Sequence, residues 1–284
     1  MGRDKPSYDG LINDIARGPH YKEFSLGPLF LNPPDIEIKI NSLGYRSNEF
    51  SMAYATKNYL FSGCSFTWGA GLPEGTYWAT RVNKSLKKNK IFNLSLVGQS
   101  ITSIVSNVYR YIRAYGPPEA IFILLPGLPR HEHVHISDDG LLNKKFAINT
   151  FSMLAHFKAN NLIKNKKEFD FLSDVFYPKD HLLYQAVNQM KVLEEYLEMK
   201  GIPFLWSTWD IEFIPMLENF NVLNNYFKMP GVDPEWLHEN EPKDAASKKY
   251  WNRAGDAPLH HPGIGEQIHF ANHFFEQFKK RYGI

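Results

Sequence analysis

The stretch KNYLFSGCSFTWG, residues 57–69, decides the fold of this chain of 284 residues. Its first half is an apolar and aromatic run of the kind that a buried strand uses. Gly63 then allows a sharp turn, and Ser65 follows at the carboxyl end of the strand, where open α/β sheets place their ligands. A serine in such a turn can expose its hydroxyl and direct its own N–H at a developing oxyanion. Ser65 is therefore the candidate nucleophile.

A second chemically rich segment lies near the other end of the chain. The sequence GDAPLHHPG, residues 255–263, places Asp256, His260 and His261 on one short loop that contains two prolines. A helix is predicted directly after it, over residues 264–282. A serine, an aspartate and a histidine in this chain order are the parts of an acyl-transfer triad. We therefore expect folding to bring the serine turn and the histidine loop into one pocket.

Together the two segments resemble the SGNH (GDSL-type) hydrolase superfamily. That family carries Gly-Asp-Ser at the nucleophile, whereas this chain reads Gly-Cys-Ser at 63–65. The lead-in NSLGYRSNEF (41–50) and the glycine block NLSLVGQS (93–100) also look like family motifs. The resemblance covers residues 41–125 and 250–282. It implies an α/β fold, with a flavodoxin-like parallel sheet in a three-layer α/β/α arrangement.

The resemblance also implies the roles of individual residues. Ser65 is the nucleophile, and His261 is preferred to His260 as the base because it precedes proline, as the family's base often does. Asp256 orients the base, although it precedes both histidines by more than the family's two intervening residues, so the loop must bulge. The backbone N–H groups of Ser65 and Gly98 form the oxyanion hole. No cofactor is implied.

The third family block departs from the pattern. In the family, the amide of an asparagine in this block completes the oxyanion hole. This chain reads LPGLPRH at 125–131 and has no asparagine there. Losing one such donor costs about 3–4 kcal/mol of transition-state stabilisation. Gln99 and Arg130 are the two candidate substitutes, and Arg130 could alternatively grip an anionic substrate. The departure also leaves open that this protein is a degenerate member of the family without catalytic activity.

Aromatic rings near the two blocks suggest the substrate. Phe, Trp and Tyr make up 15% of the chain, and flat apolar rings beside hydrogen-bonding groups form a natural platform for sugars. The expected substrate-binding residues are Trp68, Gln99, Arg130 and Trp251. We predict a serine esterase that deacylates a small-molecule ester or a carbohydrate ester and binds no metal. The alternatives are a non-catalytic carbohydrate-binding or virion structural protein, and an O-acyltransferase.

Two other features have competing interpretations. Cys64 could itself be a nucleophile, but residues 64 and 65 point in different directions, and a small buried filler is the commoner role of a free cysteine. The sequence HEHVH at 131–135 could place three imidazoles on one face of a strand. No carboxylate follows at a diagnostic spacing, so we interpret these residues as exposed loop histidines and expect no metal.

Composition narrows the class of protein. The formal charge of +2 gives no broad electrostatic case for binding nucleic acid or an anionic membrane. The chain has neither a membrane-spanning apolar run nor an apolar core of signal-peptide length in residues 1–17. We expect a cytoplasmic protein, with association with a virion as the alternative. The sequence does not indicate an oligomeric state.

The order of predicted elements indicates a single α/β domain over residues 1–284. Strands are predicted at 58–63, 91–96, 119–125 and 203–208. Helices are predicted at 75–88, 100–115 and 181–200. This alternation implies a parallel sheet with helices on both faces. The chain also has an N-terminal arm (1–45) and two insertions (130–180 and 210–255). We expect the two insertions at the rim of the site.

Overall fold

The computed structural model describes residues 36–51, 58–127, 130–135, 144–149, 167–168, 171, 178–210, 213–219, 223–244, 248–251 and 261–283. Its central sheet has four parallel strands in the order β2-β1-β3-β6. They are β1 (Tyr59–Gly63), β2 (Phe92–Asn93), β3 (Ala120–Leu125) and β6 (Phe204–Thr208). The order is that of a flavodoxin-like sheet. The predicted parallel α/β sheet is confirmed, with β2 shorter than expected.

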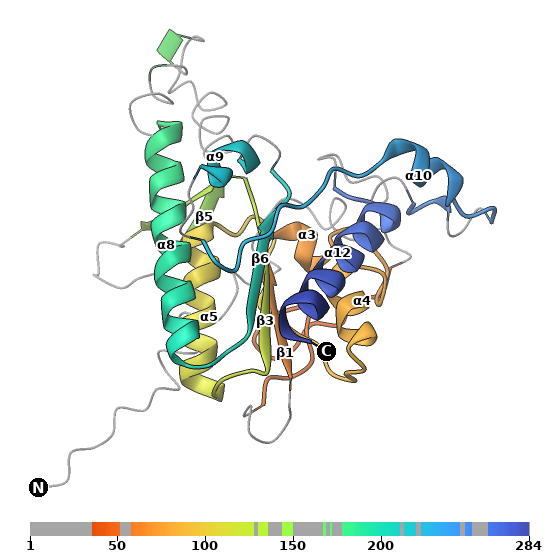
Figure 1. Cartoon of the computed structure of the whole chain (residues 1–284), viewed down its shortest axis with the longest axis horizontal. Coiled ribbons are helices and arrows are strands. Elements are labelled where there is room, and N and C mark those ends of the chain that lie inside the picture. Colours follow the sequence, from red (N-terminus) through yellow and green to blue (C-terminus); the bar gives the residue numbers. More distant parts are fainter. Residues whose placement is uncertain are drawn as a thin grey trace, which may run out of the picture.

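Helices cover both faces of this sheet (Figure 1). On one face lie α5 (Ile101–Tyr115) and α8 (Lys179–Met199), and on the other lie α4 (Trp78–Ser85) and α12 (Ile264–Tyr282). Each of these helices was predicted within a few residues of its observed bounds. The three-layer arrangement is therefore confirmed.

The central strand β3 is apolar throughout because it is buried on both faces. In β3, Ile121 and Ile123 belong to the core beneath α5 and α8. Phe122 and Leu124 belong to the second core, beneath α4 and α12. Side chains of a strand alternate between faces, so a strand covered on both sides needs apolar residues at every position. The continuous run AIFILL satisfies this requirement.

Parallel strands bring all their carboxyl ends to one edge of the sheet. At that edge β1 continues into the short helix α3 (Ser65–Trp68), β2 leads toward Gly98, and β6 leads to Trp209. Segments far apart in the sequence therefore converge where the sequence predicted the site.

The two insertions contain additional elements. After β3, strands β4 (Arg130–His135) and β5 (Lys144–Asn149) form an antiparallel hairpin. The second insertion carries α9 (Ile214–Glu218) and α10 (Pro234–Glu239). The sequence of residues 148–159 predicts partly helical character. This prediction is wrong at 148–149, which belong to β5, and residues 150–159 lie outside the described part. Among the described helices, none is long and apolar enough to cross a bilayer.

Candidate active site

Ser65 is the first residue of α3, immediately after the turn that ends β1. A side chain at Gly63 would collide with the Thr67 hydroxyl and approach the Leu124 carbonyl oxygen to 2.6 Å. Glycine is therefore required for β1 and α3 to meet this closely. Ser65 is only 2% exposed, and its hydroxyl donates to the sulfur of Cys64 at 3.9 Å. Cys64 is fully buried.

Side chains from distant parts of the chain hold the carbonyl groups of α3. The amide of Gln267, on α12, donates from Nε2 to the Phe66 carbonyl at 3.1 Å. Asn93, at the end of β2, donates from Nδ2 to the Thr67 carbonyl at 3.1 Å. Both side chains are buried. Since these carbonyls have no partner within so short a helix, the contacts satisfy them and fix the orientation of the turn.

Arg46 holds the far end of the same turn. Its Nη1 donates to the Gly69 carbonyl at 2.6 Å and to that of Trp68 at 3.3 Å. Its guanidinium also lies over the Tyr77 ring at 4.5 Å and pairs with Glu74 at 3.1 Å. A buried guanidinium requires such partners. Arg46 therefore stabilises the loop that carries the candidate nucleophile.

His261 lies beside the serine turn. Its ring centroid is 5.6 Å from that of Phe66, the residue after Ser65, and the side chain is 8% exposed. The structure thus brings the serine turn and the histidine segment together, as the sequence predicted. Asp256 and His260 lie outside the described residues, so their roles stay predictions.

The start of α12 fixes the backbone next to His261. The N–H of Gly263 donates to the Glu266 carboxylate at 3.0 Å, and the N–H of Ile264 donates to the Tyr250 carbonyl at 2.7 Å. Burial raises the pKa of Glu266, and the hydrogen bond from Gly263 opposes that rise. These contacts anchor the end of the histidine segment on the body of the fold.

Gly98, one of the two proposed oxyanion donors, and Gln99, a candidate third donor, lie in the turn after β2. Gly98 has a φ of 78°, a conformation that favours glycine. Gln99 is 2% exposed, and its Oε1 accepts the N–H of Leu96 at 3.0 Å. Its Nε2 is buried and has no hydrogen-bond partner among the described residues. A buried amide with an unused donor is costly, so Gln99 has a donor available for a substrate.

The aromatic residues are arranged differently from the prediction. Trp68 and Trp251 are 2% and 5% exposed, which leaves little ring surface for a sugar. Trp251 also donates from Nε1 to the Leu237 carbonyl at 2.8 Å. Instead, Phe66 and Trp209 stack with centroids 4.4 Å apart, and both are only partly buried. The sequence offered one usable signal for this pair, the position of Trp209 directly after a strand.

Arg130 is the first residue of β4, and its side chain lies outside the described part. The histidines at 131–135 belong to strand β4, so their prediction as loop residues is wrong; their side chains lie outside the described part as well. Within the described residues, no group of three or more His, Cys, Asp or Glu side chains could hold a metal ion. Pro126 and Gly127 follow β3, at the point where the family has its asparagine.

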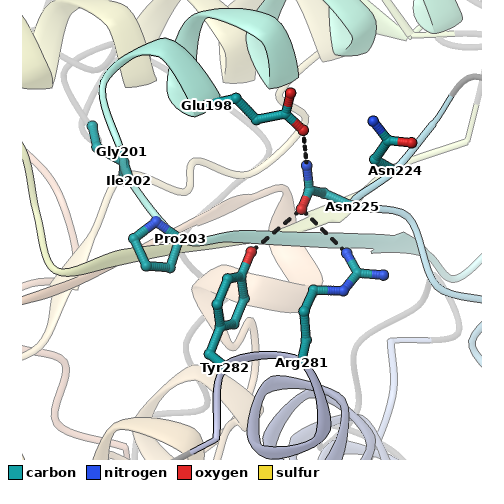
Figure 2. A pocket seen from close by; sticks show the side chains of 8 residues that line it. All are labelled: Glu198, Gly201, Ile202, Pro203, Asn224, Asn225, Arg281 and Tyr282. Atoms are coloured by element: carbon teal, nitrogen blue, oxygen red, sulfur yellow. Dashed lines mark hydrogen bonds between the residues drawn. The ribbon is translucent and has the colours of Figure 1, made fainter.

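A separate pocket of about 480 Å³ lies at the opposite edge, beside the start of β6. Figure 2 shows Asn225 between Glu198, Arg281 and Tyr282. Its Nδ2 donates to Glu198 at 3.2 Å, and its Oδ1 accepts from Arg281 at 3.2 Å and from the Tyr282 hydroxyl at 3.3 Å. Because these groups pair with one another, they stabilise the junction of α8, β6 and α12. The pocket contains none of the proposed catalytic residues.

Comparison with known proteins gives a likeness of fold. No protein-family model and no curated protein matches the chain. Among solved structures, TesA is 11% identical to this chain with a TM-score of 0.44, and the match covers 78% of this chain and 98% of the TesA chain. A lipolytic G-D-S-L family protein from Veillonella parvula has 13% identity, a TM-score of 0.41 and the same coverage. Esterase EstA from Pseudoalteromonas sp. has 10% identity and a TM-score of 0.42, covering 80% of this chain and all of EstA.

The second of these structures is described as a lipolytic protein of the G-D-S-L family, and the third as an esterase. At such identities and TM-scores they establish no activity for this chain. Its chemistry has to be inferred from its own residues.

Proposed function

We propose that this chain is a serine ester hydrolase of the SGNH type. The observation that carries the proposal is the contact between Phe66, next to Ser65, and His261, which lie in distant parts of the sequence. A hydroxyl turn and an imidazole at the carboxyl edge of a parallel sheet provide a nucleophile and a base. The motifs of the serine turn and the histidine loop support the same assignment.

In the proposed reaction, His261 takes the proton from the Ser65 hydroxyl as its oxygen attacks the ester carbonyl. Asp256 orients the imidazole and stabilises its charged form. The oxyanion accepts hydrogen bonds from the N–H groups of Ser65 and Gly98. The imidazolium then protonates the departing alcohol, and an acyl-enzyme remains. Water that His261 activates releases the acid and restores Ser65.

We propose Gln99 as the third oxyanion donor, in place of the family's asparagine. Its buried Nε2 has no partner among the described residues, and it directly follows Gly98. An unused donor in a buried position is already desolvated, so it can stabilise a developing negative charge strongly. Arg130 is the alternative donor, at the start of β4.

The proposed substrate is an O-acylated carbohydrate. The half-buried stack of Phe66 and Trp209 adjoins Ser65 and provides an apolar face against which a sugar ring can pack. The two alternatives remain acyl transfer to a sugar hydroxyl and a binding protein without catalysis. The missing asparagine favours the second of these.

Hydrolysis of p-nitrophenyl acetate tests the proposal. Ser65→Ala should abolish release of p-nitrophenol beyond the uncatalysed rate. Ser62→Ala is the matched control, because Ser62 is also buried and its hydroxyl has no partner among the described residues. Turnover retained by Ser65→Ala would remove Ser65 from the mechanism. Inactivity of the wild-type protein on acyl esters, with and without a sugar acceptor, would favour the binding protein.

A further inference from the structure

Helix α12 carries two imidazoles outside the proposed catalytic pocket. His269 and His273 stand four residues apart, on the same face of the helix. Their ring centroids are 4.3 Å apart with an interplanar angle of 63°. Both side chains are partly exposed. Two histidines at this spacing are the arrangement by which a helix presents a pair of ligands to a metal ion.

A backbone contact orients the first of these rings. The Nε2 of His269 lies 2.8 Å from the carbonyl oxygen of Pro230. A carbonyl oxygen only accepts hydrogen bonds, so Nε2 carries the proton, and in the neutral ring Nδ1 keeps its lone pair. Metal-binding histidines commonly donate their other N–H to a backbone carbonyl or a carboxylate in this way. The contact therefore prepares His269 as a ligand through Nδ1.

We infer that His269 and His273 form a chelating site for a late first-row divalent cation. Imidazole ligands suit Zn²⁺, Cu²⁺ and Ni²⁺, and Cu²⁺ binds tightest to a given set of nitrogen donors. No third His, Cys, Asp or Glu side chain joins this pair among the residues that the structure describes. Water would fill the remaining positions, so the site is open and the metal exchangeable.

The site is independent of the proposed ester hydrolysis. Neither histidine has a role in that reaction, and no step of it requires a metal. His269 already contacts the backbone at Pro230 through Nε2. A bound cation would hold the same imidazole a second time, through Nδ1. Metal binding and esterase activity can therefore be tested separately, and the failure of one leaves the other unaffected.

Calorimetric titration of the EDTA-treated, dialysed full chain with CuCl₂ or ZnCl₂ tests the site. His269→Gln and His273→Gln should each abolish the same binding event. Glutamine at 269 can still donate to Pro230, which preserves the local contact. His181→Gln is the control, since it removes an exposed imidazole from α8 and should leave that event unchanged.

Moving the second histidine along the helix tests the spacing between the two imidazoles. In the double variant His273→Gln with Gln277→His, the composition is unchanged, but the second imidazole moves to eight residues from His269, about 12 Å along the helix. The binding event should remain absent. Circular dichroism in EDTA verifies that each variant is folded. An event that persists in both single variants, or returns in the exchanged variant, overturns the site and assigns binding to other histidines.

Discussion

Gln267 is hydrogen-bonded to Phe66, from which it is separated by 201 positions in the sequence, with Nε2 3.1 Å from the carbonyl oxygen. The same amide accepts the N–H of Trp78 through Oε1 at 2.8 Å. One buried side chain thus joins α12, the start of α4 and the turn that carries Ser65. Because α12 follows His261 directly, this contact helps to fix the spacing of the proposed nucleophile and base.

Replacing Gln267 should lower both stability and turnover. Gln267→Leu leaves the Phe66 carbonyl and the Trp78 N–H buried without partners, at about 1–3 kcal/mol for each group. We expect the free energy of unfolding in urea to fall by about 2 kcal/mol or more. Ester turnover, measured well below the unfolding midpoint, should fall about 10-fold or more because the reacting groups lose their alignment.

The control for this prediction is Gln189→Leu. Gln189 also forms amide hydrogen bonds, with Thr102, but nearer the surface between α5 and α8. It should retain turnover and lose less than about 1 kcal/mol. Full turnover in folded Gln267→Leu would show that the contact plays no part in positioning the site.

Gly63→Ala should destabilise the protein and reduce turnover. The added methyl group meets the Thr67 hydroxyl and lies 2.6 Å from the Leu124 carbonyl oxygen, so β1 and α3 must shift. Overpacking of this kind costs about 1–3 kcal/mol. Chemical denaturation measures the loss. Gly231→Ala is the control, because a methyl group there meets nothing within 4 Å, and equal stability of the two variants would contradict the prediction.

The sequence predicted the framework because its signals are local. The run before Gly63 marked β1, and similar apolar runs marked β3 and β6, since a strand buried on both faces is predominantly apolar. The family motifs then indicated which strand end carries Ser65. The expected convergence with His261 came from the order of the triad residues and from the resemblance to the family, whose base lies in a loop before the last helix.

The remaining features depend on long-range contacts that no local pattern encodes. Trp68 was predicted to bind the substrate because it lies close to Ser65 in the sequence, but the fold buries its side chain. The half-buried partner of Phe66 is Trp209, which reaches the turn only because β6 ends at the same edge. The role of Gln267 likewise depends on how α12 packs against α4. A polar residue within a helix gives no sequence signal for such a contact.

Glu194 should make stability depend on pH. Its carboxylate accepts hydrogen bonds from the Trp206 indole at 2.7 Å and from the N–H groups of Asn225 and Asn224 at 2.9 and 3.1 Å. Burial nevertheless raises its pKa above the ordinary 4.5, because desolvation exceeds the effect of those bonds. The stability that Glu194 contributes is therefore complete below pH 4.5 and is lost as the pH rises through the folded-state pKa.

Glu194→Gln removes this titration. Urea unfolding at several pH values should show the wild-type protein losing stability relative to Glu194→Gln as the pH rises from about 4 to about 8. Glu195→Gln is the control, because that neighbouring carboxylate is 62% exposed and forms only a loose ion pair with Lys191. An unfolding free-energy difference between wild type and Glu194→Gln that stays constant across this range would contradict the prediction.

Gln99→Glu should impair catalysis through the oxyanion hole. Glutamate keeps an oxygen that can accept the Leu96 N–H but has no N–H to donate. If Gln99 is the third donor, kcat should fall about 10²-fold or more, with little change in KM. Steady-state kinetics measure both, with the unfolding midpoint determined in parallel. A folded variant with unchanged kcat would instead leave Arg130 as the candidate donor.

The most direct test of the central claim is labelling with a fluorophosphonate, which reacts only with an activated serine. Mass spectrometry should find a single adduct, located on Ser65 and absent from Ser65→Ala. The rate of labelling should fall about 10³-fold or more in His261→Gln. An unlabelled Ser65 in the folded wild-type protein, or labelling at the same rate without the His261 imidazole, would contradict a Ser65–His261 catalytic pair.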